Sequence, residues 1–247
     1  MTDLFQTTMG WRPLLAVGGL AALLAWETAQ PFFAQFARPR DRARHGALNL
    51  ALGVLNILVI ALVFAGVWLA TTRWAAEQRF GLLNWLEAPE WLRWPLALLL
   101  LDTWMYFWHR LNHAAPFLWR FHRWHHADRA MDVTTASRFH TGEIVLSSVL
   151  RVPLLALIGC RIEELALYEL MLAAVVQFHH ANIALPEPLD RALRWVIVTP
   201  HLHKVHHSVV RAESDSNYSS LFSWWDRLFR TLRLVRDPRK IVFGVDG

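Results

Sequence analysis

Three histidine clusters are the part of this sequence best suited to chemistry. Two share the form His-x-x-His-His, and a third, His-x-x-x-His, comes just before the first of them. Their eight members are His109, His113, His122, His125, His126, His203, His206 and His207. Residues three or four positions apart share one face of a helix, so each cluster can turn two or three imidazoles toward one ion. Because 13 histidines in 247 residues rarely form three such clusters by chance, we predict a metal site.

The ligand types indicate which metal to expect. Imidazole suits zinc, copper, iron and nickel, but a structural zinc site usually includes thiolates, and the sequence holds one cysteine, Cys160. Eight histidines without a cysteine pair therefore indicate two ions. Oxidation of a C–H bond needs redox chemistry that only the metal can supply. Since the clusters adjoin apolar segments, we expect two iron ions, with dioxygen as the co-substrate.

Carboxylates near the clusters are candidates to orient the imidazoles through their second ring nitrogen. Asp102 lies seven residues before His109, which is two turns back on the same helix face. The other candidates are Asp128, Asp132, Glu143, Asp215 and Asp226. Each of them could equally be a solvated loop charge. Among the histidines outside the clusters, we expect His45 at the level of lipid headgroups and His201 in a loop.

Long apolar runs separate the polar segments. Hydrophobic residues make up 55% of the chain and the mean hydropathy is +0.25, above the level of an ordinary soluble domain. About 20 apolar residues in a helix cross the hydrocarbon core of a bilayer, which the runs near 11–36 and 46–70 satisfy. A third run covers 92–108. The runs 144–158 and 162–178 carry charges, and we expect them to form a hairpin that spans the bilayer or enters it partway.

Loop charges predict the orientation in the membrane. Segment 38–44 holds four arginines, segment 110–143 holds five more, and the part after residue 180 holds ten lysines and arginines. The 71–91 loop has two arginines against three glutamates. The positive-inside rule therefore places every histidine cluster on the cytoplasmic side, with the 71–91 loop outside. We expect a multi-pass protein of the bacterial inner membrane. The arginines form no stripe with interleaved aromatic residues, so we expect no nucleic-acid partner.

Several motifs follow one another between about residues 100 and 231. They are Asp102-x-x-x-Tyr106-x-Trp108-His109-Arg110-x-x-His113, Leu118-Trp-Arg-x-His122-x-x-His125-His126, Arg138-Phe-His140-x-x-Glu143, Phe178-x-His180-x-Asn182, Thr199-Pro-x-x-His203-x-x-His206-His207-Ser208, Asp215-x-Asn217-Tyr218 and Trp225-Asp-Arg-Leu-Phe229. With these motifs the chain resembles the fatty acid hydroxylase/sterol desaturase superfamily of membrane-bound, histidine-rich di-iron oxidoreductases. It departs from the pattern at Thr141, where proline is usual, and at Ser219 and Arg230, where glycines are usual.

The resemblance implies a ligand set and a fold. It implies metal ligands at the eight clustered histidines and at His180, and it adds His140 as a further candidate. It leaves out His179, where the family varies. The implied fold is all-α, a multi-pass bundle of about four transmembrane helices under a cytosolic helical cap that holds the dimetal centre. We expect a single integral membrane domain over 1–247, with mainly transmembrane helices in 1–99 and the catalytic region in 100–231.

The resemblance also implies an activity. Members of the superfamily use dioxygen and external electrons to hydroxylate or desaturate a lipid C–H bond. Since the sequence shows no haem-binding or flavin-binding module, we expect a separate electron donor, such as a ferredoxin, a cytochrome or a reductase. Hydroxylation, desaturation and ether-lipid oxidation share these motifs and stay open. The alternative from another class is a non-catalytic, histidine-rich metal-binding membrane protein, which would have a closed ligand shell and no lipid pocket.

Overall fold

The computed structural model describes residues 2–245, and side chains from residue 14 onward. The longer helices are α1 (Thr2–Ala29), α2 (Pro39–Val59), α3 (Ala65–Glu77), α5 (Glu90–Ala114), α6 (Pro116–His126), α7 (Thr141–Ile158) and α8 (Ile162–His180). The shorter elements are α4 (Leu82–Trp85), α9 (Glu187–Leu193), α10 (Pro200–His206), α11 (Arg211–Ser214), α12 (Trp224–Leu228) and the turns η1 (Ile60–Phe64), η2 (Val133–Ser137) and η3 (Pro238–Lys240). Residues 2–245 form no extended strand, which confirms the predicted all-α class.

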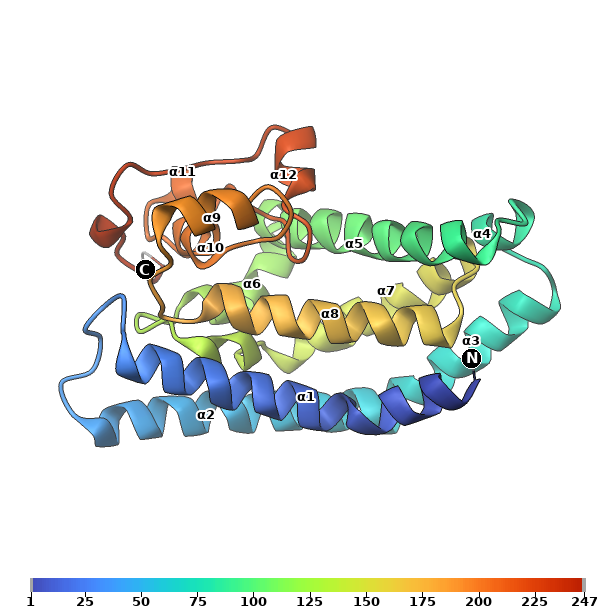
Figure 1. The fold of residues 1–247 in the computed structure, drawn as a ribbon, viewed down its shortest axis with the longest axis horizontal. Helices are drawn as coiled ribbons and strands as arrows, with labels where there is room; N and C mark the ends of the chain where they lie inside the picture. Colours follow the sequence, from blue (N-terminus) through green and yellow to red (C-terminus); the bar gives the residue numbers. More distant parts are fainter. Residues whose placement is uncertain (1, 246–247) are drawn as a thin grey trace.

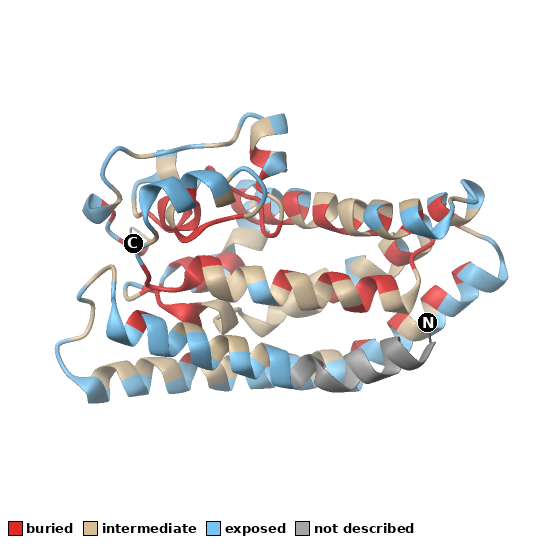
Figure 2. Cartoon of the chain, in the orientation of Figure 1, coloured by how far each residue is buried: buried red, intermediate tan, exposed pale blue. Residues whose placement is uncertain are grey.

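The long helices lie along the long axis of the molecule, and the short C-terminal helices gather over one end of it (Figure 1). α8 packs against α1, α5 and η2, while α3 packs against α7. Buried residues concentrate where the C-terminal segments meet α5 and α8, whereas α1 and α2 are largely exposed (Figure 2). Buried residues are therefore most concentrated at the end covered by α9–α12 and the segments that connect them, which we call the cap.

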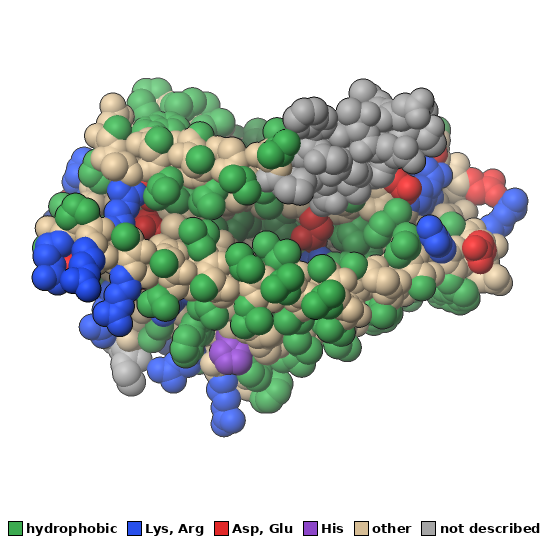
Figure 3. Space-filling view, turned by 90° about the horizontal axis from the view of Figure 1, so that it is seen from below, with side chains coloured by type: hydrophobic (Ala, Val, Ile, Leu, Met, Phe, Trp, Pro, Cys, Tyr) green, Lys and Arg blue, Asp and Glu red, His purple; other side chains and the backbone are tan. Residues whose placement is uncertain are grey.

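Within residues 2–245, two helical segments are long and apolar enough to cross a membrane. The first joins α2, η1 and α3 within Pro39–Trp85, and the second is α7. Only 11% of the residues in the most apolar window of the first segment are buried, so its apolar side chains face outward as those of a lipid-exposed helix would. Figure 3 shows this apolar face, hollowed along its middle between two ridges of hydrophobic side chains.

The helix boundaries differ from the predicted apolar runs in two places. α1 ends at Ala29 rather than near residue 36, because Pro31 lacks the backbone N–H that a continuing helix requires. α5 continues beyond residue 108 to Ala114, so its last turns carry two of the clustered histidines. The residue before a proline disfavours the helical conformation, and Pro116 accordingly separates α5 from α6.

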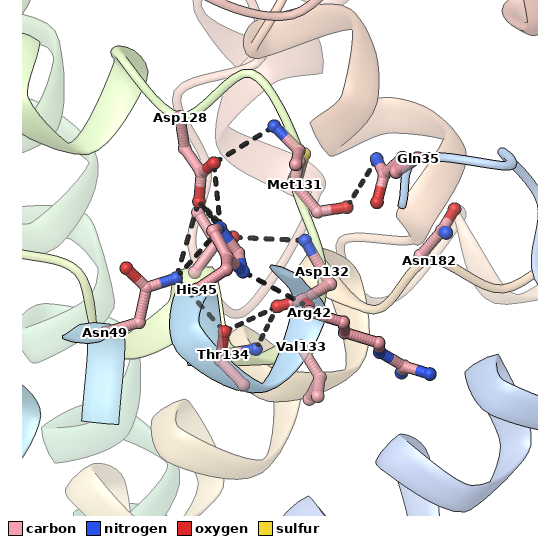
Figure 4. A network of polar contacts seen from close by, with 12 residues as sticks. Gln35, Arg42, His45, Asn49, Asp128, Met131, Asp132, Val133, Thr134 and Asn182 are labelled. Carbon is pink, nitrogen blue, oxygen red and sulfur yellow. Dashed lines mark hydrogen bonds and ion pairs between the residues drawn. The ribbon is translucent and has the colours of Figure 1, made fainter. Parts of the chain in front are cut away.

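The expected position of His45 was wrong. Its imidazole is mostly buried and forms ion pairs with Asp128 (Nε2–Oδ2 2.9 Å) and Asp132 (Nδ1–Oδ2 3.5 Å). Figure 4 shows this network, in which Asn49 donates to Thr134 beside the histidine. These contacts hold the imidazole inside the protein rather than among headgroups, and they fix α2 to the loop that follows α6.

A buried ion pair organises the end of the bundle opposite to the cap. The guanidinium of Arg93, at the start of α5, donates to Glu164 of α8 (2.7 Å) and to the carbonyl of Gly159 (2.7 Å). Both charged side chains are almost fully buried. Gly159 ends α7 in the left-handed conformation (φ 69°), which glycine adopts without strain. The pair therefore joins the ends of three helices.

We predict that Arg93→Met lowers the free energy of unfolding by about 3–5 kcal/mol, because it leaves the buried Glu164 carboxylate unpaired. Denaturant titration in detergent micelles measures the change. The matched control is Arg161→Met, whose partner Glu90 is half exposed, and for which a loss of about 0–1 kcal/mol is expected. Equal losses for the two variants would contradict the role of the buried pair.

Candidate metal centre

The ends of α5, α6 and α8 meet the cap helix α10 and bring the clustered histidines together. The last turns of α5 and α8, the second half of α6, and α10 with the residue that follows it each contribute imidazoles. They form a five-histidine group of His109, His113, His122, His126 and His206 and a four-histidine group of His125, His180, His203 and His207. Within each group the ligand nitrogens all lie within 4.8 Å of one another, and all nine side chains are buried. These are the nine residues predicted as ligands, other than the added His140.

The Nε2 atoms of the imidazoles converge. In the five-histidine group, Nε2 of His109 lies 2.9 Å from Nε2 of His206. In the four-histidine group, Nε2 of His180 lies 3.1 Å from that of His125 and 3.0 Å from that of His203. Nitrogens that close together repel when each carries a lone pair, unless a cation lies among them. The two groups are thus clusters of converging nitrogens that could bind metal ions.

Backbone carbonyls hold the opposite side of these rings. Nδ1 of His109 donates to the carbonyl of Tyr218 (2.8 Å), and Nδ1 of His206 donates to that of Ser216 (2.7 Å). Nδ1 of His180 does the same to Val176 (2.8 Å) within its own helix. An acceptor at Nδ1 keeps the proton there, which leaves the Nε2 lone pair free to bind a metal. The sequence gives no signal for these carbonyls, because every residue has one.

Of the carboxylates expected to orient imidazoles, Glu143 does so directly. Its Oε1 lies 3.0 Å from Nδ1 of His122. Asp215 lies farther away, 3.4 Å from Nδ1 of His113, and also pairs with Arg211.

Asp102 has a different role from the predicted one. Its carboxylate accepts hydrogen bonds from Tyr168, from the indole of Trp225 and from the backbone of Phe222, so it anchors the cap to the bundle rather than orienting His109. Asp226 similarly accepts the backbone N–H groups of two cap residues. Asp128 and Asp132 bind His45, as described above.

Two further histidines near the centre lie outside both groups. His140 accepts a hydrogen bond from the backbone N–H of Gly142 at its Nδ1 (2.9 Å) and thereby caps the start of α7. His179 is buried, and its ring centroid lies 3.8 Å from that of His203. It adjoins the four-histidine group, although the resemblance to the superfamily did not include it among the ligands. His201 lies in α10 rather than in a loop, close to Asp190 and away from both groups.

Burial keeps these ligands in the form that binds metals. The pKa of His125 lies well below its ordinary value, chiefly because burial penalises the charged form and secondly because other imidazoles surround it. Burial lowers the pKa of His206 and His207 in the same way. Neutral imidazole is the metal-binding form of histidine, so the site is ready for a cation at neutral pH.

The donor set fits two transition-metal ions. It consists of nitrogens supplemented by one nearby carboxylate, and its two groups each offer four or more ligand atoms. Nε2 of His122 is buried without a hydrogen-bond partner among the described residues, although it belongs to the five-histidine group. An unsatisfied buried nitrogen is costly unless an ion binds it. Iron, copper and zinc all accept such imidazole ligands.

A cavity of about 260 Å³ reaches both groups from the bundle side. Its walls near the histidines are largely apolar and include Met105 and Trp108 of α5 and Leu172 and Val176 of α8. Imidazoles from both groups line it, among them His122 and His203. An apolar chain that enters this cavity would end beside the converging nitrogens.

Comparison with known proteins agrees with this site. The sequence pattern of the fatty acid hydroxylase family matches residues 94–231, and the chain belongs to this family. The matched segment contains all nine histidines of the two groups. The superfamily predicted from the motifs is therefore confirmed.

The chain is also similar to several curated proteins. It is 30% identical to the ornithine lipid hydroxylase OlsE of Rhizobium tropici, over 63% of this chain and 48% of that protein. It is 28% identical to the alkylglycerol monooxygenase of Homo sapiens (84% and 44%) and 24% identical to the cholesterol 25-hydroxylase of Rattus norvegicus (62% and 50%). The chain spans about half the length of these relatives. No solved structure matches it significantly.

We predict that His125→Ala and His206→Ala each lower the iron content of the purified, iron-loaded protein, because each removes a ligand from a different group. Mass-spectrometric metal analysis measures the number of ions per chain, and circular dichroism verifies the helical fold. The matched control is His140→Ala, which should keep the metal and cost about 1 kcal/mol through the lost helix cap. Full metal content in both group variants, or its loss in the control, would contradict the assignment.

Proposed function

We propose that this chain is a membrane di-iron oxidoreductase that uses dioxygen and external electrons to hydroxylate or desaturate a lipid C–H bond. One observation carries the proposal: nine buried imidazoles converge in two groups at the head of an apolar cavity. Bound iron would supply the redox chemistry that dioxygen activation requires. A closed metal-storage or structural site would have no use for an apolar passage to its ligands, which favours an enzyme over a non-catalytic metal protein.

The residues of the chain would position this chemistry. Both histidine groups would hold the ions, and the backbone carbonyls of Ser216 and Tyr218 would keep the ligand nitrogens directed inward. Glu143 would do the same for His122. The apolar walls would exclude water and direct the hydrocarbon of the substrate toward the metals, which limits side reactions.

The membrane arrangement follows from charge and hydropathy. We propose that α1, the continuous α2–α3 segment, α5 and the α7–α8 hairpin form about four membrane elements. His45 of α2 binds Asp128, so the arginine-rich segment 38–44 and the histidine groups lie at the same end of the bundle. The positive-inside rule would place that end, with the cap, in the cytoplasm. A separate ferredoxin, cytochrome or reductase would then reach the centre from that side.

Ether-lipid oxidation is the second candidate activity. The similarity to alkylglycerol monooxygenase covers 84% of this chain, a larger share than the 63% matched by the ornithine lipid hydroxylase. The relatives are named for an ornithine lipid, an alkylglycerol and cholesterol, which supports a lipid as the substrate. Both activities would use the same histidine groups and differ in the carbon that the cavity presents.

Comparative lipidomics of cells that express or lack the protein tests the proposal. We predict that expression gives a lipid one oxygen atom derived from isotopically labelled dioxygen, or removes two hydrogens from it, and that His125→Ala abolishes the product. Loss of an alkyl ether would identify the second activity. If no lipid changed, and the reduced, iron-loaded protein in lipid consumed no oxygen, the proposed function would be wrong.

A further inference from the structure

An ion pair lies in the wall of the cavity, away from the metal groups. Nη1 of Arg151, in the middle of α7, donates to Oε1 of Glu169 in α8. The two side chains are 11% and 34% exposed, and both line the cavity that reaches the histidines. The guanidinium also lies over the ring of Trp68, 4.9 Å from its centroid. Charged groups inside apolar membrane helices are costly and usually mark substrate or ion paths.

The pair bridges two helices that pack against different neighbours. α7 and α8 follow one another in the chain, yet α7 packs mainly against α3, and α8 packs mainly against α1, α5 and η2. The cavity occupies the space between them, lined by Ile144 and Ser148 on one side and Leu172 and Val176 on the other. In Figure 3 acidic and basic side chains are visible in the hollow of the apolar face.

Helix geometry gives the distance of the pair from the metal groups. Arg151 follows Glu143, which binds His122, by eight residues, or about 12 Å at the helical rise per residue. Glu169 precedes His180 by eleven residues, or about 16 Å. Both helices therefore place the ion pair roughly 12–16 Å from the imidazoles along the cavity.

Most of the hydrogen-bonding capacity of the pair is unused. Among the described residues, the bond to Glu169 is the only hydrogen bond of the Arg151 guanidinium, which has five N–H donors. The pair is neutral overall and offers donors and acceptors side by side. A carboxylate would compete with Glu169 for the arginine, and an ammonium would compete with Arg151 for the glutamate. An uncharged hydroxyl or amide can both donate and accept without displacing either partner.

We propose that Arg151 and Glu169 bind the uncharged polar group, a hydroxyl or an amide, of a lipid whose apolar end points to the histidine groups. This inference rests on the proposed function, since it names the substrate class for that site. It follows that oxidation falls on a carbon remote from the bound polar group. The pair would thus determine both the kind of lipid accepted and the position of the reaction along its chain.

Photo-crosslinking in lipid nanodiscs tests the orientation without any turnover. Two long-chain alcohols serve as probes, one with a diazirine beside the hydroxyl and one with it near the methyl end. We expect the first to label peptides around 147–151 and 169–173, and the second to label peptides around 105–109 and 139–144. Mass spectrometry of the digests locates the labels. The reverse pattern, or a fatty acid probe that labels the ion-pair segments more strongly than the alcohol, would overturn the proposal.

A double variant tests the residues themselves. In Arg151→Leu/Glu169→Leu we expect the hydroxyl-end probe to lose its preference for the ion-pair segments several-fold. The fold should persist, because apolar replacement of a buried ion pair is often neutral or stabilising. The matched control is Arg161→Leu/Glu90→Leu, which removes an exposed pair outside the cavity. An unchanged labelling pattern in the Arg151→Leu/Glu169→Leu variant would show that the pair is only structural. If that variant fails to fold, the labelling pattern of the wild-type protein still tests the proposal.

The test separates this inference from the proposed function. If the probes label the expected peptides in a protein that consumes no oxygen, the proposed binding site is supported and the proposed oxidoreductase activity is refuted. Oxygen-dependent lipid oxidation with random or reversed labelling would refute the role of Arg151 and Glu169 and leave the enzyme intact.

Discussion

The structure depends on holding buried, neutral imidazoles with their Nε2 lone pairs facing one another. Without a cation, the Nε2 atoms of His109 and His206 would repel at 2.9 Å, because both rings donate their Nδ1 protons to backbone carbonyls. Hydrogen bonds from Nδ1 to fixed acceptors oppose the repulsion, each with a net contribution of about 1 kcal/mol. The cap supplies two of these acceptors, because the carbonyls of Ser216 and Tyr218 lie in its irregular segment. Metal binding and folding of the cap are therefore expected to be coupled.

The cap is in turn anchored to the bundle by two buried carboxylates. Asp102 joins α5 to α8 and to the backbone of Phe222, and Asp226 fixes the backbone N–H of Tyr218. The carbonyl of that same Tyr218 holds His109. A chain of hydrogen bonds thus runs from the Asp226 carboxylate through the backbone of Tyr218 to the imidazole of His109.

Helical spacing and residue type were sufficient to identify eight of the nine histidines that the structure brings together in two buried groups, and the family resemblance added His180. The sequence also predicted the all-α class and the orienting role of Glu143. It could not predict partners set by tertiary contacts: Asp102 has the right spacing from His109, but the indole of Trp225 and other donors occupy its carboxylate. The conformation of the loops could not be predicted from the sequence either. Arg230, at a position where glycine is usual in the superfamily, adopts φ 58°, in the left-handed region that favours glycine.

The central claim is that two neighbouring ions are bound chiefly by imidazole nitrogens. X-ray absorption at the iron edge, on the iron-loaded protein in lipid, tests it most directly. The account predicts a first shell of nitrogen and oxygen atoms, the outer-shell scattering characteristic of several imidazoles, and an iron neighbour. A spectrum without imidazole scattering, with sulfur ligands, or from iron bound only by water and carboxylates would contradict it.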